Sequence, residues 1–241
     1  MENSVYIGLS GQIALQSQMN LIAQNIANIN TPGYRGQNAV FDEFLEKPKG
    51  MKETMSMALD YAQFQNTDAG PVKITGGDLD VALVGPGFIG IQTPDGIQYT
   101  RAGNFTMDPQ GKLINARGMA VASDGGGDIV IPDDAGAIYI DKSGMVSSDQ
   151  GEIGRIMIHE FASEQLLEPV GNGLYKADGE GAAATKTTMH QGKLEGSNVQ
   201  GVLEITRMID VSREYQMTQR IIQNEHERIR TMIQRLGRAS A

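Results

Sequence analysis

The sequence NIANINTPGYR, from Asn25 to Arg35, marks where the first long element of this chain ends. Pro32 disfavours the helical conformation at the residue before it, and Gly33 supplies the positive φ of a type II turn. Upstream of this turn there is no proline between residues 4 and 29. The stretch therefore predicts an N-terminal helix that reaches about Ile29 and stops at a tight turn.

An apolar stripe runs along the predicted N-terminal helix. Its residues recur at spacings of four and three, as one face of a helix requires: Leu15, Met19, Ile22, Ile26 and Ile29. The opposite face carries glutamine and asparagine side chains and almost no charge. Because a solvated helix face is normally rich in charged residues, we expect this polar face to be partly buried.

A second long helix is predicted at the C-terminal end of the chain. Ser197 and Asn198 can cap its start, and arginines gather in its last turns, where the helix dipole favours cations. Apolar residues follow on steps of three and four, with polar residues interrupting the same seam: Ile205, Met208, Tyr215, Ile222, Ile229, Ile233 and Leu236. A long helix gains most of its stability from packing one face. The two helices are therefore expected to pair with each other, with copies of themselves or with partners.

The middle of the chain has a different pattern. Between residues 70 and 196, short apolar or alternating runs are separated by Gly, Pro, Asn and Asp, which is typical of antiparallel strands joined by turns. The segment 36–69 is ambiguous, since it mixes a Lys-Pro-Lys-Gly run with several methionines, and it is predicted only as a connection. The expected fold is α+β, in four parts: a helix in 1–35, the connecting segment 36–69, a β-rich domain in 70–196 and a helix in 197–241.

Composition excludes several functions. The 241 residues include 20 basic and 29 acidic side chains, and the formal charge of −9 disfavours general binding to nucleic acid. The absence of cysteine excludes disulfides and thiolate sites, and no stretch has the roughly 18 unbroken apolar residues of a membrane span. Glu2 stands where a secretory signal peptide would be basic, so no such signal is predicted.

Residues with catalytic or metal-binding chemistry are scattered along the chain. His159, His190 and His226 have no spacing suited to a metal ion, and no grouping of Ser, His and Asp is indicated. We therefore expect no cofactor, no metal site and no enzymatic activity.

The peptide from Asn25 to Arg35 resembles the signature that ends the N-terminal helix of the flagellar axial family, the rod and hook proteins. Further stretches resemble this family in the family's own order: 79–88, 99–105, 108–113 and 194–199. Together these matches extend over most of the chain. Its length, and the short spacing between Arg35 and Gly70, resemble the proximal rod proteins most, with a distal rod protein as the alternative.

This resemblance implies a structural subunit that is exported by the flagellar type III apparatus without a cleaved signal peptide. It implies assembly with copies of itself and with other rod subunits into a tubular shaft that crosses the periplasm, transmits torque and forms the export channel. In this family the paired terminal helices form a coiled-coil-like inner domain, D0, and the β-rich domain D1 lies outside it. A periplasmic binding module that dimerises through its helices is a further alternative.

The resemblance also implies which residues pack between subunits. They are the two predicted stripes together with two asparagines near the end of the N-terminal helix: Leu15, Met19, Ile22, Asn25, Ile26, Asn28, Ile29, Ile205, Met208, Tyr215, Ile222, Ile229, Ile233 and Leu236. The turn motif of the family corresponds to Asn30, Thr31, Pro32, Gly33 and Tyr34.

Overall fold

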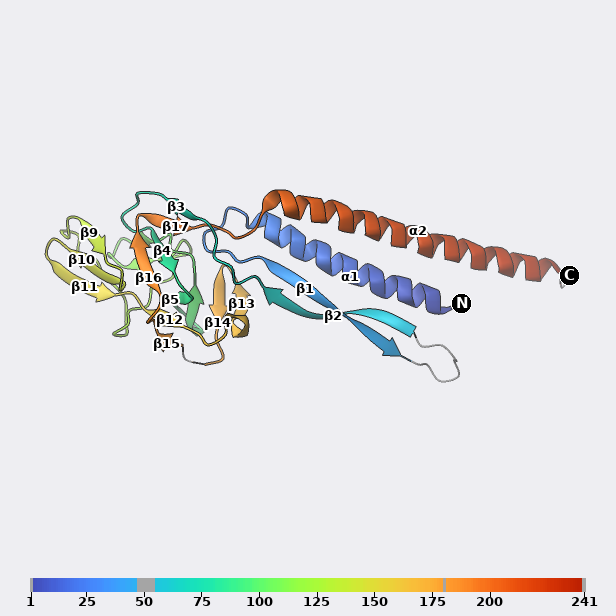
Figure 1. Ribbon diagram of the computed structural model, residues 1–241, viewed down its shortest axis with the longest axis horizontal. Coiled ribbons are helices and arrows are strands. Elements are labelled where there is room, and N and C mark those ends of the chain that lie inside the picture. The colour runs from blue at the N-terminus through green and yellow to red at the C-terminus, as the bar shows by residue number, and fades with distance from the viewer. Residues whose placement is uncertain (1, 47–54, 180, 240–241) are drawn as a thin grey trace. The chain divides into compact units, whose positions relative to one another are not determined.

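The computed structural model describes residues 2–46, 55–179 and 181–239 (Figure 1). The described chain divides into two compact units. The helical unit contains both long helices and residues 37–65, and the β-rich unit contains residues 28–36 and 66–199. The fold class is α+β, as the sequence predicts.

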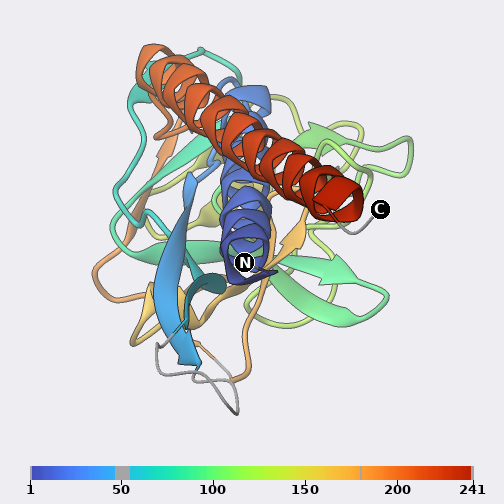
Figure 2. The same cartoon turned by 90° about the vertical axis from the view of Figure 1, so that its right-hand side faces the viewer.

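In the helical unit, α1 (Glu2–Ala27) and α2 (Gly201–Ala239) run side by side in both views (Figures 1 and 2). A side chain added at Gly8 would meet Ile222, and Asn25 bonds to Glu204, so the two helices are antiparallel. With 39 residues against 26, α2 continues past the N-terminal end of α1. The predicted packing of the terminal helices is therefore present within one chain.

The face that α2 turns toward the rest of the helical unit follows a heptad pattern. Its less exposed residues recur at alternating steps of four and three: Glu204, Met208, Val211, Tyr215, Thr218, Ile222, Glu225 and Ile229. The predicted seam shares Met208, Tyr215, Ile222 and Ile229 with this face. Two of the polar residues that interrupt that seam, Gln219 and His226, are exposed. Apolar residues occupy two neighbouring phases of this helix, so periodicity alone does not identify the inward phase.

A β-hairpin completes the helical unit. Strands β1 (Gln37–Glu46) and β2 (Met55–Gln65) pair antiparallel, with a register shift after Val40. Both strands pack against α1. The sequence predicts this segment only as a connection, because a Lys-Pro-Lys-Gly run stands next to several methionines in it.

The β-rich unit is built from short strands and one turn of 3₁₀ helix. The strands are β3 (Val72–Ile74), β4 (Val81–Val84), β5 (Gly87–Thr93), β6 (Gly96–Thr100), β7 (Thr106–Met107), β8 (Leu113–Ile114), β9 (Ile138–Ile140), β10 (Met145–Ser148), β11 (Gly151–Arg155), β12 (Ile158–Glu160), β13 (Glu168–Gly171), β14 (Leu174–Lys176), β15 (Ala182–Ala183), β16 (Thr188–Gln191) and β17 (Lys193–Glu195). The 3₁₀ turn, η1, spans Glu164–Leu166.

These strands form one larger sheet and several small ones. The larger sheet has the order β13-β14-β6-β5-β12-β15, a second sheet has the order β11-β10-β9, and the remaining strands form the ribbons β16-β4, β17-β3 and β7-β8. Every strand pair described is antiparallel, as predicted. Two ribbons join the first strands of the unit, β3 and β4, to its last strands, β17 and β16.

Strand β5 separates two apolar clusters. Successive side chains of a strand point to opposite faces, so Ile89 and Ile91 enter the main core whereas Phe88 enters a smaller aromatic cluster with Tyr99 and Tyr175. The main core also contains Val81, Leu83, Phe105, Leu113, Val121, Ile129, Ile131, Val146, Ile156 and Met189. The β-rich unit therefore has an apolar core of its own. Full burial of one such side chain contributes about 1.5–3 kcal/mol to stability.

The two units differ from the predicted domains at two places. Residues 28–36 group with the β-rich unit and not with the N-terminal helix, because the turn is hydrogen-bonded into that unit. Residues 37–65 group with the helices, because the hairpin packs against α1.

Candidate interaction site

The turn that ends the N-terminal helix is buried in the β-rich unit. Gly33 has φ +65°, in the region that the sequence predicts, and its N–H donates to the carbonyl oxygen of Glu195 at 2.9 Å. A Cβ on this residue would lie 2.4 Å from the carbonyl carbon of Arg101. Only glycine therefore fits here, both for its conformation and for the close approach of the two backbones.

An ion pair lies directly beneath this turn. Arg101 and Glu195 are each 1% exposed, and both Nε and Nη2 of Arg101 lie 3.0 Å from Oε2 of Glu195. Arg101 Nη1 also donates to the carbonyl oxygens of Gly85, at 2.7 Å, and of Gly87. Burial lowers the pKa of Arg101 while the Glu195 carboxylate opposes that shift, and arginine keeps its proton in proteins.

A second arginine continues this network. Arg35, the last residue of the signature peptide, is buried and forms an ion pair with Glu164. The guanidinium carbons of Arg35 and Arg101 lie 5.4 and 5.5 Å from the centroid of the Phe88 ring. Both distances are within the range of favourable cation–π contacts. One aromatic ring therefore receives two buried cations, each with its own carboxylate partner.

Asn198 joins three segments that are distant in the sequence. Its Oδ1 accepts the N–H of Gly36 at 2.8 Å, and its Nδ2 donates to the carbonyl oxygens of Asn66 and Asp68 at 3.0 and 2.8 Å. Its backbone N–H donates to the carbonyl oxygen of Tyr34 at 3.2 Å. The first residues after the turn, the segment after β2 and the segment before α2 are therefore held at one point.

Three of the stretches that carry the family resemblance thus converge: residues 25–35, 99–105 and 194–199. Reasoning from the sequence did not assign Arg35, Arg101, Glu195 or Asn198 to a site. The available signal was the presence of charged residues inside those resembling stretches. Their pairing joins residues 94 to 162 positions apart, which local periodicity does not reveal.

In the helical unit, Asn25 is buried and bonds to the start of the hairpin. Its Nδ2 donates to the carbonyl oxygen of Gln37 at 2.9 Å, and its Oδ1 accepts the N–H of the same residue at 3.0 Å. Its Nδ2 also lies 3.4 Å from Oε2 of the buried Glu204, whose Oε1 pairs with Arg207 at 2.7 Å. These residues line a cavity of about 110 Å³. Asn25 therefore connects α1, β1 and α2 inside one unit.

The structure places the other predicted packing residues in three groups. Ile22 is buried, while the half-buried residues are Leu15, Met19, Ile26, Asn28, Ile29, Met208, Tyr215, Ile222 and Ile229. Ile205 is 52% exposed because it follows the inward residue Glu204 by one position, and Ile233 is 65% exposed in the stretch 230–235, where every residue of α2 is exposed. The side chain of Leu236 lies outside the described residues.

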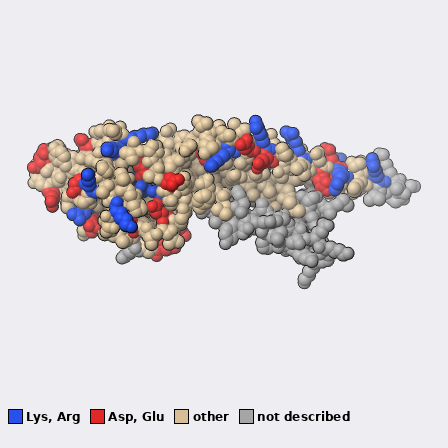
Figure 3. Space-filling view, viewed as in Figure 1, with Lys and Arg blue, Asp and Glu red and all other residues tan. Residues whose placement is uncertain are grey.

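Many apolar side chains of the two helices are exposed. On α1 they are Ile7, Leu9 and Ile13, and on α2 they are Val202, Leu203, Ile205, Ile209, Met217, Ile221, Met232 and Ile233. Val202 is 84% exposed. After Glu2, α1 has no charged residue. Figure 3 shows wide uncharged areas between the charged side chains along α2. Exposed apolar surface of this kind marks sites of association.

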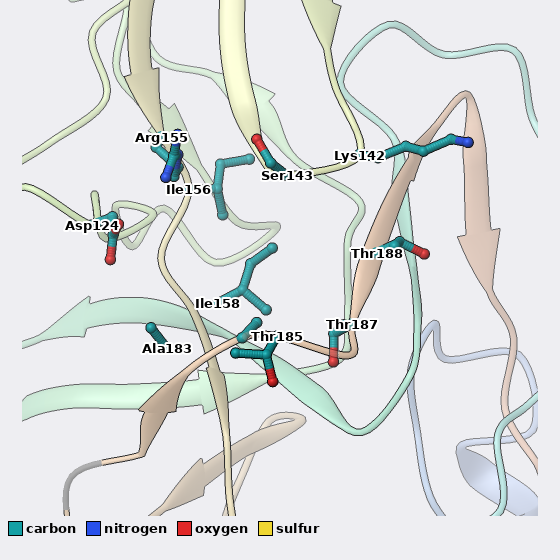
Figure 4. A pocket seen from close by; sticks show the side chains of 11 residues that line it. Asp124, Lys142, Ser143, Arg155, Ile156, Ile158, Ala183, Thr185, Thr187 and Thr188 are labelled. Atoms are coloured by element: carbon teal, nitrogen blue, oxygen red, sulfur yellow. The ribbon is translucent and has the colours of Figure 1, made fainter.

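A groove of about 370 Å³ lies in the β-rich unit (Figure 4). Ile156 and Ile158 line it together with Lys142, Arg155 and several hydroxyl side chains. Figure 4 shows Lys142 and Arg155 on different sides of the groove. Among the residues that the structure describes, no three His, Asp or Glu side chains are grouped so as to hold a metal ion. No described helix is long and apolar enough to span a membrane.

Comparison with known proteins gives three family matches along the chain. Residues 5–35 match the flagella basal body rod protein model, residues 82–148 the flagellar hook protein FlgE/F/G D1 domain, and residues 190–235 the flagellar basal body rod FlgEFG protein C-terminal model. The flagellar basal-body rod protein FlgF of Caulobacter vibrioides is 35% identical, with 99% of each chain covered. FlgG of Bacillus subtilis is 31% identical over 97% of this chain and 98% of its own, and FlgF of Rhizobium meliloti is 29% identical over 98% and 99%.

Proposed function

This chain belongs to the flagellar basal-body rod FlgE/F/G family and is an FlgF-like structural subunit of the rod, and from that premise we propose how it assembles. The family is structural and not enzymatic. The chain polymerises, with copies of itself and with other rod subunits, into the helical tube of the proximal rod. The tube transmits torque and encloses the export channel, and its subunits leave the cytoplasm through the flagellar type III apparatus without a cleaved signal peptide.

The observation that carries this proposal is the exposed apolar surface of α1 and α2. The helices bury one face of each helix against the other elements of the helical unit, yet a second set of apolar residues on the same helices remains exposed. Covering one such side chain fully contributes about 1.5–3 kcal/mol. Neighbouring subunits supply this cover. Contacts between different surfaces of identical subunits, when they do not close into a ring, generate an open helical assembly.

The subunit-packing residues divide into two roles in this proposal. Inward residues such as Ile22 and Ile222 hold α1 and α2 together within one chain. Exposed residues such as Ile205 and Ile233 pack on neighbouring subunits. The turn from Asn30 to Tyr34 stabilises the folded β-rich unit, and its hydrogen bonds to distant segments support this role.

The proximal position is supported by the similarity to one FlgF relative. The FlgF relative from Caulobacter vibrioides is 35% identical over 99% of this chain, against 31% over 97% for the FlgG relative from Bacillus subtilis. Locating the tagged chain in a density map of purified basal bodies tests this position. Density in the distal part of the rod would assign the chain to the distal rod instead.

The experiment that tests the assembly surface is Ile209→Asp. Ile209 is exposed in the single chain, so the substitution leaves the isolated subunit folded, but assembly would bury an unpaired carboxylate. We expect normal thermal unfolding of the monomer, no incorporation into rods and loss of motility. The matched control is Gln223→Asp, which places the same charge at an exposed polar position of the same helix.

Two outcomes would contradict this surface. Motile cells with normal rods made from the Ile209→Asp chain would show that Ile209 is not covered on assembly. Saturation at a dimer in sedimentation, with no larger species, would support a binding module that dimerises through its helices. A tube subunit continues to add copies as its concentration rises.

A further inference from the structure

Four consecutive residues near the end of the β-rich unit, Glu195 to Asn198, bond to two segments that precede them in the chain, residues 33–36 and 66–71; we name these four residues the closing segment. Glu195 accepts the N–H of Gly33 with its backbone oxygen and the N–H of Gly70, at 3.2 Å, with its carboxylate. Gly196 donates its N–H to the carbonyl oxygen of Pro71 at 2.9 Å. Asn198 supplies the bonds to residues 34, 36, 66 and 68 described above.

The closing segment also supplies the carboxylate that pairs with Arg101. Arg101 follows strand β6, and Glu195 lies 94 residues later at the end of β17. Arg35 is a second buried cation near Arg101 and raises the cost of leaving Arg101 unpaired. A core built around Arg101 without Glu195 would bury an uncompensated charge, which is among the most destabilising changes in a protein.

The strand topology points the same way. β4 pairs with β16 and β3 pairs with β17, so the first strands of the unit acquire these partners only when its last strands are present. Contacts between residues so far apart require the closure of a long loop, whose loss of entropy is offset only when the rest of the fold has formed. Both the buried charge and the topology therefore require the last strands and Glu195 before the earlier part of the unit becomes stable.

We propose that the closing segment and the turn from Gly33 to Gly36 form a folding gate, so that the β-rich unit becomes stable only when both are in place. The core strands cannot stand alone while residues 195–198 are still being made or are held elsewhere. If the chain is exported as the proposed function requires, this gate keeps the β-rich unit unfolded until the whole chain is available. The hydrogen bonds of the closing segment then complete the fold.

Native-state hydrogen exchange of the full-length chain at low concentration tests this proposal. The gate amides are those of Gly33, Gly36 and Gly70, and the core amides are those of Gly90, Val121 and Ile131, all with hydrogen-bond acceptors in the structure. If the core depends on the gate, both sets open in one cooperative step, with protection within about tenfold and the same dependence on urea. Gate amides that exchange about 100-fold faster than core amides, with little dependence on urea, would overturn the proposal.

Three variants of the full chain locate the effect. Glu195→Gln leaves Arg101 unpaired and should lower core protection on the order of 1,000-fold. Adding Arg101→Met to Glu195→Leu removes both charges and should raise core protection again, well above that of Glu195→Gln. Lys112→Met breaks the partly exposed pair between Lys112 and Asp128, which lies outside the closing segment, and should leave core protection unchanged.

Two results would overturn the gate. Glu195→Gln with core protection like that of the original chain would show that the pair does not control closure. A double variant as weakly protected as Glu195→Gln would show that the buried charge is not what keeps the unit open. Because these measurements use the dilute monomer, they do not depend on rod assembly, and failure of the proposed assembly surface in the Ile209→Asp test is seen separately.

Discussion

Replacing Gly33 by alanine tests how tightly the N-terminal turn is built into the β-rich unit. Gly33 has φ +65°, and a non-glycine residue in this left-handed region costs roughly 1–2 kcal/mol. The new Cβ would also lie 2.4, 2.5 and 2.6 Å from backbone atoms of Arg101 and Ala102, whereas real Cβ atoms essentially never approach below 3.0 Å. Relief of such crowding costs about 1–3 kcal/mol.

The two costs together predict a loss of about 2–5 kcal/mol in the free energy of unfolding. This is a large part of the roughly 5–15 kcal/mol that stabilises a typical domain. Urea unfolding followed by near-ultraviolet circular dichroism reports on the β-rich unit, because Tyr99 and Tyr175 are buried in its aromatic cluster. The variant should unfold at a clearly lower urea concentration.

Gly76→Ala is the matched control for this prediction. Gly76 has φ +72°, but no heavy atom lies within 4 Å of the Cβ it would acquire. It should therefore lose only the conformational part, roughly 1–2 kcal/mol. Equal destabilisation by the two substitutions would refute the close approach between the turn and residues 101–102.

Two further predictions concern other parts of the chain. A Cβ at Gly8 would lie 2.9 Å from Cγ1 of Ile222, whereas a Cβ at Gly11 would have no atom within 4 Å. Gly8→Ala should therefore be about 1–3 kcal/mol less stable than Gly11→Ala in thermal unfolding followed by far-ultraviolet circular dichroism. Equal stability of the two variants would contradict the close packing of α1 on α2. Desolvation raises the pKa of Glu160, but hydrogen bonds from the Thr187 hydroxyl and from the N–H groups of residues 185–187 outweigh it and lower this pKa from 4.5 to about 2. Because the pKa of Glu160 is depressed in the folded state, the stabilisation by its carboxylate is present above pH 4.5 and is lost as the pH falls through 2. The amide of Thr187 should lose hydrogen-exchange protection between these pH values. A Glu160→Gln variant with the same pH dependence would assign the loss of protection to another group.

Local patterns in the sequence determined the elements at both ends of the chain. The long proline-free, periodic segments produce α1 and α2, and α1 ends at Ala27, shortly before the turn that Pro32 and Gly33 predict. These effects act between residues a few positions apart, so they can be read without knowing the fold. The antiparallel β-rich middle followed in the same way from its turn residues. The resembling stretches added the family, which the comparisons then showed.

The tertiary structure decided which of these residues meet. Neither the hairpin β1–β2 nor the inward face of α2 follows from periodicity, because the hairpin and α2 both pack against α1, and this packing is set by the tertiary structure. The pairing of Arg101 with Glu195, and the bonds of Asn198 to two distant segments, join residues far apart in the chain. A sequence specifies such buried charges only through the whole fold, since their cost is repaid by partners that folding alone brings within reach.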